Sequence, residues 1–262
     1  MDLGLKGKKA LVTGASAGLG FAAAKALAGE GAVVIINSRS EERLNKAAGE
    51  IEQATGNRPD TLVGDLSTDD GLQKVARKVK ALEHLDILVS NTGGPPPGKF
   101  LDLDARAWHD AGRLLLESAV RLTNLVLPGM IERKWGRLIY ITSIAVLQPI
   151  DDLILSNTYR AGVTAFCKTV SNNYASEGIT ANCVCPGYTG TERLKDLAAK
   201  RAETSGKTAD QVMADFGATA PAGRVGRPEE LAALITFLAG ERAGYITGSS
   251  IAVDGGANRA IV

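Results

Sequence analysis

Short runs of continuous apolar residues alternate with longer helix-patterned stretches along most of this chain. The runs expected to form strands are Lys9–Thr13, Val33–Ile36, Asp86–Ser90, Arg137–Thr142 and Thr180–Val184. The stretches expected to form helices are Gly18–Ala28, Arg39–Ala54, Thr68–Glu83, Asp104–Arg133 and Leu153–Glu177. Because the strand runs do not alternate with polar residues, helices are expected to cover both of their faces, as in a parallel sheet. Right-handed crossovers then predict a doubly wound α/β sheet that binds ligands at the carboxyl ends of its strands.

Three segments depart from this alternation, and none of them is a linker between two halves. We therefore expect one domain over residues 1–262. Thr191–Gly217 is polar and helical, which predicts a small lid or substrate lobe at about residues 190–225. Gly93–Gly98 follows a strand and contains three consecutive prolines, so an extended loop that walls the ligand cleft is expected. Ile251–Gly256 is expected to form a last strand and a turn.

Composition narrows the class of partner. Thirty Lys and Arg against 29 Asp and Glu give a net charge of +1, which argues against nucleic acid or an anionic membrane as the main partner. No signal peptide is expected, and no apolar run approaches the ~18 residues of a membrane span. Cys167, Cys183 and Cys185 have poor metal spacing and the chain has two histidines, so no metal site is expected. The cysteines are expected to be buried and free in a reducing cytoplasm.

A glycine-rich turn, Thr13–Gly20, joins the first expected strand to the first expected helix. Glycines at positions 14, 18 and 20 allow a tight turn and a close approach of the backbone to a pyrophosphate, whose charge meets the helix N-terminus. A simple glycine-rich turn that binds no cofactor would show the same sequence pattern. The position within the first strand–helix–strand unit favours a dinucleotide site.

The Thr-Gly-xxx-Gly-x-Gly spacing resembles the short-chain dehydrogenase/reductase family, and the match continues over nearly the whole chain. Gly64-Asp65-Leu66, Ser90–Gly93, Gly136–Ser143, Pro186-Gly187 and Val253–Gly256 resemble the later family signatures in their order. The 3-oxoacyl-acyl-carrier-protein reductase-like subgroup is the most similar. The resemblance implies a Rossmann-like fold and an NAD(P)-dependent oxidoreductase that transfers hydride between the cofactor and an unidentified small carbonyl or alcohol substrate.

The resemblance also implies which residues bind the cofactor. They are Gly14, Ser16, Gly18, Leu19, Gly20, Ser38, Arg39, Asp65, Leu66, Asn91, Gly93, Arg160, Pro186, Gly187, Thr189 and Thr191. NADP is favoured and NAD is possible, because no acid stands near Ser38 to hold a ribose 2′-hydroxyl and Arg39 can fork onto a 2′-phosphate. Two points weigh against this preference. Arg39 at a helix start is also consistent with a solvated charge, and Ala17 stands where many NADP-dependent relatives have Lys or Arg.

The catalytic positions of the family are mostly substituted. The family uses a Ser, a Tyr, a Lys four residues after the Tyr, and an Asn. Ser143 matches the family serine, and Ser156 lies 13 residues later, at the family's serine-to-tyrosine separation. Alignment therefore gives Ser143, Ser156 and Arg160 as the catalytic candidates, with Leu115 at the Asn position. Tyr159 has Val163 four residues after it, so a packing role is expected for it.

These substitutions limit proton transfer. A serine hydroxyl is far less acidic than a phenol, and arginine keeps its proton. Losing acid–base assistance costs about 10²–10⁴ in rate, whereas holding the reactants together still supplies about 7–11 kcal/mol. An oxidoreductase with a remodelled site and a cofactor-binding protein without turnover, acting as a sensor or an assembly subunit, both stay open. Arg160 and Arg193 would suit an anionic substrate, although a solvated Arg193 is the simpler interpretation.

Assembly is expected only from the resemblance. Relatives usually pair their two long helices, here Asp104–Arg133 and Leu153–Glu177, into homodimers or homotetramers. An apolar stripe on the first of them would serve either the core or such an interface. The stripe consists of Leu114, Leu115, Ala119, Leu122 and Val126.

Overall fold

The computed structural model describes residues 1–260, which fold around a seven-stranded sheet of order β3-β2-β1-β4-β5-β6-β7. Every neighbouring pair of strands is parallel. The strands are β1 Lys9–Val12, β2 Val33–Ser38, β3 Asp60–Val63, β4 Ile87–Ser90, β5 Gly136–Ile141, β6 Ile179–Pro186 and β7 Ser250–Val253. The sheet order reverses at β1, as the crossover rule requires of a doubly wound sheet. The predicted doubly wound α/β fold is confirmed.

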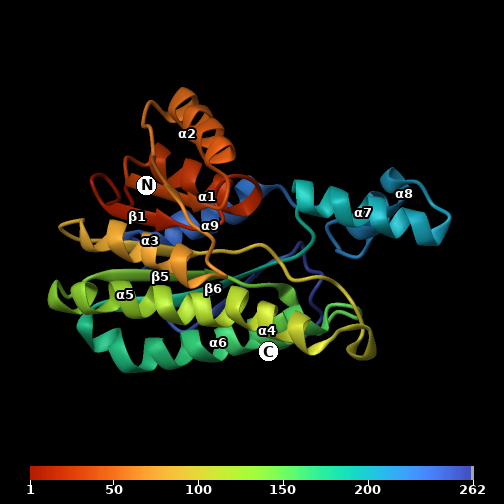
Figure 1. The fold of residues 1–262 in the computed structure, drawn as a ribbon. Coiled ribbons are helices and arrows are strands. Elements are labelled where there is room, and N and C mark those ends of the chain that lie inside the picture. The colour runs from red at the N-terminus through yellow and green to blue at the C-terminus, as the bar shows by residue number, and fades with distance from the viewer. Residues whose placement is uncertain (261–262) are drawn as a thin grey trace.

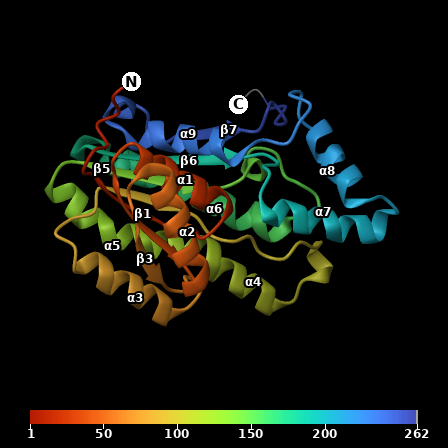
Figure 2. The ribbon, with the colours of Figure 1, turned by 90° about the horizontal axis from the view of Figure 1, so that it is seen from above.

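Helices cover both faces of this sheet (Figure 1). The first layer contains α1 Gly18–Gly29, α2 Glu41–Thr55 and α9 Pro228–Ala239. The second contains α3 Asp69–Lys80, α5 Ser118–Glu132 and α6 Ile154–Tyr174. Each layer has its own apolar core, because the continuous apolar strands present side chains to both faces. Figure 2 shows α1 and α9 beside each other in the first layer.

The long helix expected over Asp104–Arg133 is divided. The chain forms α4 Ala105–Gly112, a π-helical turn over Arg113–Glu117, and then α5. In residues 1–260 the helical stretch Ala105–Glu132 is apolar enough to cross a membrane by length and composition. However, 44% of its most apolar window is buried within the fold, where α5 packs against β4 and β5. The hydropathy of this stretch is therefore that of a core helix.

The apolar stripe on this helix belongs to the core rather than to the outer surface. Leu115, Ala119, Leu122 and Val126 are buried in the monomer, and Leu114 is half-buried. The structure also confirms that Cys167, Cys183 and Cys185 are buried and free.

Two elements were not expected from the sequence. The edge strand β3 was missed because three of its four residues are exposed, so no buried apolar run marks it. The helix α9 was missed although Pro228 stands at its start and two glutamates lie in its first turn.

After β6 the chain leaves the sheet and forms α7 Glu192–Ser205 and α8 Ala209–Ala218. These two helices project to one side of the molecule (Figures 1 and 2). They pack on each other through a small apolar cluster of their own, which includes Leu194, Val212 and Phe216. The ring of Tyr188 stacks on Phe216 at 4.4 Å and so joins the pair to the end of β6. The expected polar helical segment at 191–217 therefore corresponds to α7 and α8.

Candidate active site

A cleft of about 550 Å³ opens at the carboxyl ends of the strands, between the glycine-rich turn and α7. Most of the predicted cofactor-binding residues line it. They are Gly14, Ser16, Gly18, Leu19, Ser38, Arg39, Asp65, Leu66, Asn91, Gly93 and Thr191. The other predicted residues do not line this cleft, namely Gly20, Arg160, Pro186, Gly187 and Thr189.

The glycine-rich turn is held by Asn91 at the end of β4. Gly14 and Gly18 have positive φ angles of 57° and 60°, a conformation that favours glycine. A side-chain carbon on Gly20 would lie 2.4 Å from the Gly14 carbonyl oxygen. The Asn91 amide donates to that oxygen at 3.1 Å, and the Thr13 hydroxyl donates to the Asn91 carbonyl at 2.7 Å. Contacts within the chain therefore define the shape of the turn.

The N-terminus of α1 is suited to an anion. Its N-cap residue, Ala17, supplies no side-chain cap, and no acid stands in its first turn. By contrast, a side-chain oxygen caps the first turn of α2, α3, α4, α7 and α8. The first N–H groups of α1 thus face the cleft with no side-chain acceptor, next to a backbone that glycines leave open. The pyrophosphate of a dinucleotide fits this position.

Two arginines stand at the end of β2. Arg39 is 79% exposed in its side chain and lies 3.9 Å from the Asp65 carboxylate. Arg43 also lines the cleft, in the first turn of α2, where its N–H donates to the Ser40 side chain at 3.3 Å. Sequence reasoning missed Arg43. Its signal was its position four residues after Arg39 in the expected helix Arg39–Ala54, although the helix itself begins only at Glu41.

Asp65 is held in place by the loop that leads into α3. Its carboxylate accepts hydrogen bonds from the Ser67 backbone at 2.9 Å and the Ser67 hydroxyl at 2.7 Å. Thr68 then caps α3 by accepting from the Gly71 N–H at 3.1 Å. Ser67 thereby holds one carboxylate oxygen of Asp65, while the other oxygen faces Arg39.

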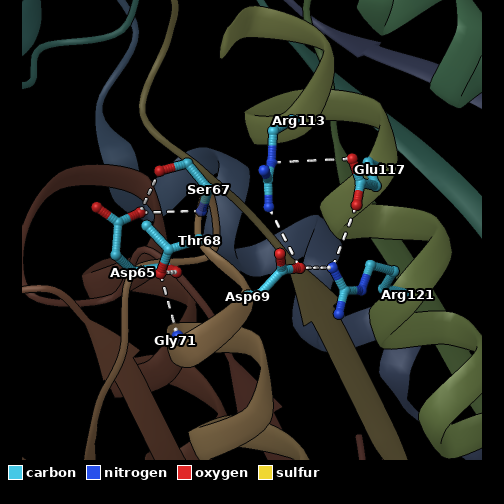
Figure 3. Close-up of polar contacts among 8 residues, drawn as sticks. All are labelled: Asp65, Ser67, Thr68, Asp69, Gly71, Arg113, Glu117 and Arg121. Carbon is cyan, nitrogen blue, oxygen red and sulfur yellow. Dashed lines mark hydrogen bonds and ion pairs between the residues drawn. The ribbon is translucent and has the colours of Figure 1, made fainter. Parts of the chain in front are cut away.

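The first residue of α3, Asp69, connects this loop to the π-helical turn (Figure 3). It accepts from Arg121 of α5 and lies 3.2 Å from Arg113 of the turn. The hydrogen bonds from Arg121 and then Arg113 lower the pKa of Asp69 below its usual value. Glu117 contacts both arginines, at 4.0 Å from Arg113 and 3.2 Å from Arg121. The ion-pair network thus connects the Asp65 loop with the turn that carries Leu115.

The structure brings Ser156 and Arg160 together on the first turns of α6. The Arg160 Nε donates to the Ser156 hydroxyl at 3.2 Å, and Nη1 donates to the Ile141 carbonyl at the end of β5 at 2.8 Å. Burial and, to a smaller extent, the positive charge of Arg193 together lower the pKa of Arg160 to about 10. Arg160 therefore stays protonated at neutral pH. Ser143 follows β5 and accepts from the Ala145 N–H at 3.1 Å.

Leu115 and Arg160 both line a small recess of about 10 Å³. Thr92 lines both this recess and the large cleft, so the two hollows are neighbours. A leucine in this place offers no hydrogen bond, and Arg160 instead bonds the backbone of β5.

The Tyr159 side chain packs against Trp108 and Gly112 and does not join the Ser156–Arg160 pair. Its ring lies 6.0 Å from that of Trp108, and a side-chain carbon on Gly112 would approach the Tyr159 ring to 3.1 Å. The predicted packing role of Tyr159 agrees with this placement.

Arg193 is not simply solvated. From the first turn of α7 it donates to the Gly94 carbonyl at 3.2 Å and to the Pro95 carbonyl at 3.1 Å. Gly93, Gly94 and Arg193 all line the cleft. The first two residues of the loop expected as a cleft wall therefore line the cleft, the three prolines do not, and Arg193 joins the loop to α7. Thr92 and Leu114 are cleft residues that sequence reasoning did not name.

Comparison with known proteins agrees with this geometry. A family model described as Enoyl-(Acyl carrier protein) reductase matches residues 14–258. The chain is 33% identical to the uncharacterized oxidoreductase YvaG of Bacillus subtilis (strain 168), over 100% of both chains. It is 32% identical to the 3-oxoacyl-[acyl-carrier-protein] reductase FabG of Aquifex aeolicus (strain VF5), over 98% of this chain and 99% of that one.

Solved structures give the same result. The L-sorbose reductase of Gluconobacter frateurii superposes with a TM-score of 0.94 at 32% identity, with 100% of both chains covered. An actinorhodin polyketide ketoreductase superposes with a TM-score of 0.92 at 29% identity, with 97% of this chain and 98% of that one covered. The chain belongs to the short-chain dehydrogenase/reductase family. It is an NAD(P)-dependent oxidoreductase, as the sequence predicted, and a binding protein without turnover is not favoured.

Proposed function

We propose that this protein reduces a small carbonyl compound with NADPH, and oxidises the corresponding alcohol in reverse, through a site in which no phenol donates the proton. The observation that carries the proposal is the cleft itself. Its glycine-rich turn leaves the α1 N-terminus open to a pyrophosphate, and two arginines line it at the end of β2. We assign the reacting oxygen to Ser143, Ser156 and Arg160, of which Arg160 lines the recess beside this cleft and bonds Ser156.

The cofactor would be held by three parts of the chain. The α1 N-terminus binds the pyrophosphate, Asp65 and Leu66 flank the adenine, and Arg39 and Arg43 pair with a 2′-phosphate. Gly20 acts indirectly, because its missing side chain lets α1 approach the Gly14 carbonyl. We keep Pro186, Gly187 and Thr189 as cofactor residues on the family pattern, with Thr191 next to Gly18. When bound, the nicotinamide supplies or accepts a hydride.

The catalytic side chains have distinct roles in this proposal. Ser143 holds the substrate oxygen. Ser156 accepts a hydrogen bond from Arg160, which leaves its own hydroxyl hydrogen free to donate. Arg160 places a fixed positive charge beside the site but gives up no proton. The arrangement stabilises negative charge on oxygen better than it delivers a proton, so it suits substrates whose transition state needs oxyanion stabilisation most.

Structural relatives support NADPH and a small-molecule substrate. The L-sorbose reductase structure contains NADPH and L-sorbose, and the actinorhodin polyketide ketoreductase contains NADPH. YwfH, at 27% identity and a TM-score of 0.92, is an NADPH-dependent reductase involved in bacilysin biosynthesis. We transfer the cofactor to this chain because Arg39 and Arg43 stand where a 2′-phosphate would lie.

We further propose that the whole chain acts as one cytoplasmic unit without nucleic acid or membrane partners. In this unit α7 and α8, at about residues 190–225, form a lid over the cleft. Thr191, Glu192, Arg193 and Asp196 line the cleft from the α7 side, which supports the lid. A homodimer or homotetramer is proposed from the family pattern. Light scattering on the purified protein gives its mass in solution.

The test combines binding and turnover. Calorimetry should show one NADPH site per chain, and absorbance should show NADPH oxidation with at least one member of a broad carbonyl panel. Binding without any oxidation across the panel would instead support a sensor or assembly subunit, which the missing tyrosine makes the second candidate. Absence of NADPH and NADH binding would overturn both.

A further inference from the structure

We propose that the substrate carries a carboxylate close to its reacting carbonyl, and that Arg193 and Arg160 hold this carboxylate. The inference rests on the proposed reductase function and names the substrate class of that same site. The place is the end of the cleft where the Gly93–Gly98 loop meets α7, beside the recess of Arg160.

The backbone at Gly94 and Pro95 gives the Arg193 guanidinium a defined position, the Arg193 seat. A side-chain carbon on Gly94 would lie 2.3 Å from the Arg193 Nη2, so the guanidinium rests directly on the loop backbone. Its two bonds to the carbonyls of Gly94 and Pro95 fix its orientation. A guanidinium has five N–H donors, and these bonds engage only two of its nitrogens. The remaining donors of Arg193 are available to a ligand in the cleft that it lines.

Arg160 supplies a second cation next to this seat. Its bonds to Ser156 and Ile141 fix its orientation. Thr92 lines both the Arg160 recess and the Arg193 cleft, which places the two guanidinium groups at adjoining hollows. Neutral oxygens therefore orient both arginines, and among residues 1–260 these bonds leave N–H donors on each without a hydrogen-bond partner.

The charge at this end of the cleft is unbalanced. Within residues 1–260, neither Arg160 nor Arg193 has a carboxylate within ion-pair distance. After burial, the positive charge of Arg193 also lowers the pKa of Arg160, as expected for two cations at adjoining hollows. Two unpaired cations in a partly dry cleft are unfavourable unless an anion binds between them. A carboxylate matches the forked donors of arginine.

Other acids at the cleft do not fill this role. Asp65 faces Arg39 at the far end, and Glu192 pairs with Lys195 at 2.8 Å. Burial lowers the pKa of Arg193, and the negative charge of Asp196 offsets this only in part, without an ion pair between the two. Each phosphate of the cofactor already has a place, at the α1 N-terminus or at Arg39 and Arg43. The Arg193 seat is thus an additional anion site on the substrate side.

Calorimetry on the protein saturated with NADP⁺, which cannot reduce a carbonyl, tests the proposal. The probes are phenylpyruvate and α-ketobutyrate, each against its methyl ester, so that only the charge changes. The acids should bind about ten- to hundredfold more tightly than the esters. Arg193→Gln should abolish most of this preference. Lys200→Gln, which removes the same charge from an exposed position on α7, should keep it.

A second variant guards against a folding artefact. Gly94→Ala keeps the arginine but displaces its guanidinium, and should also lose the preference while its melting temperature stays close to that of the parent. Esters that bind as tightly as the acids, or no binding of either acid, would overturn the proposal. So would an Arg193→Gln variant that loses NADP⁺ affinity while keeping the acid preference. Failure of the proposed function is distinct, because it appears as NADPH that does not bind or is never oxidised.

Discussion

Replacing Arg39 with Asp should reverse the cofactor preference. In the structure Arg39 lies 3.9 Å from Asp65 with 79% of its side chain exposed. An ion pair at this distance in water is worth about 1 kcal/mol, so a 2′-phosphate readily takes its place. A guanidinium forked onto a phosphate contributes about 1.5–3 kcal/mol, which is roughly ten- to hundredfold in affinity. The unmutated protein should therefore bind NADPH more tightly than NADH by this factor.

The variant should lose that factor for NADPH and gain affinity for NADH, because its carboxylate accepts from the ribose 2′-hydroxyl and repels the phosphate. Fluorescence titration of both cofactors against the parent, Arg39→Asp and Arg39→Gln measures the ratio. The Gln variant is the control, since it removes the charge without creating the acceptor and should only equalise the two cofactors. Arg43→Gln should show a smaller loss for NADPH alone. Equal affinities in the parent would refute the assignment of Arg39.

Three further outcomes follow from the backbone and the charges. Gly20→Ala should weaken NADPH binding at least tenfold in a titration, because its new carbon lies 2.4 Å from the Gly14 carbonyl oxygen; near-parent affinity would contradict the fixed turn. Gly49→Ala should raise the unfolding free energy by about 0.5–1 kcal/mol, because its carbon meets only one side-chain atom, at 3.9 Å; a lower melting temperature would contradict this. The hydrogen bond from Arg224 lowers the pKa of Glu230 to about 2. The ionised Glu230 therefore stabilises the fold fully above the unfolded pKa of about 4.5, and this stabilisation is lost as the pH falls toward 2. Melts of parent and Glu230→Gln should therefore differ at neutral pH and converge below pH 4.5; a difference that grows on acidification would contradict the sign.

The central strands and the glycine-rich turn could be predicted because burial leaves a direct trace in the sequence. β1, β4, β5 and β6 are buried on both faces, so their residues are mostly apolar and do not alternate with exposed polar ones. The turn needs glycine at Gly14 and Gly18, where φ is positive. These constraints are local, and one sequence is sufficient to read them.

The edge strand β3 and the break in the long helix could not be predicted, because their causes are not local. β3 pairs with β2 on one side and is largely exposed, so tertiary pairing rather than its own composition makes it a strand. The π-helical turn at Arg113–Glu117 coincides with ion pairs to Asp69 of α3. A helical pattern with no proline or glycine inside the turn gives no sign of it.

The site residues also divide into those with a local sequence signal and those that only the fold brings together. The pairing of Ser156 with Arg160 follows from their spacing of four residues on one helix. The contact between Arg193 and Gly94 joins positions 99 residues apart, and only the folded loop reveals it. Arg43 had a usable signal in its spacing from Arg39, but its approach to the cleft depends on where α2 starts.

The central claim is that this reductase works without a phenol acid, and steady-state NADPH oxidation with simple ketones tests it most directly. The measurement compares the parent with the double variant Ser156→Tyr and Arg160→Lys, after both are shown to bind NADPH. We expect parent turnover to fall about 10²–10⁴-fold below typical enzyme rates of about 10 per second, and the double variant to recover part of it. A parent that already reduces simple ketones at about 10 per second would contradict the account of Ser156 and Arg160.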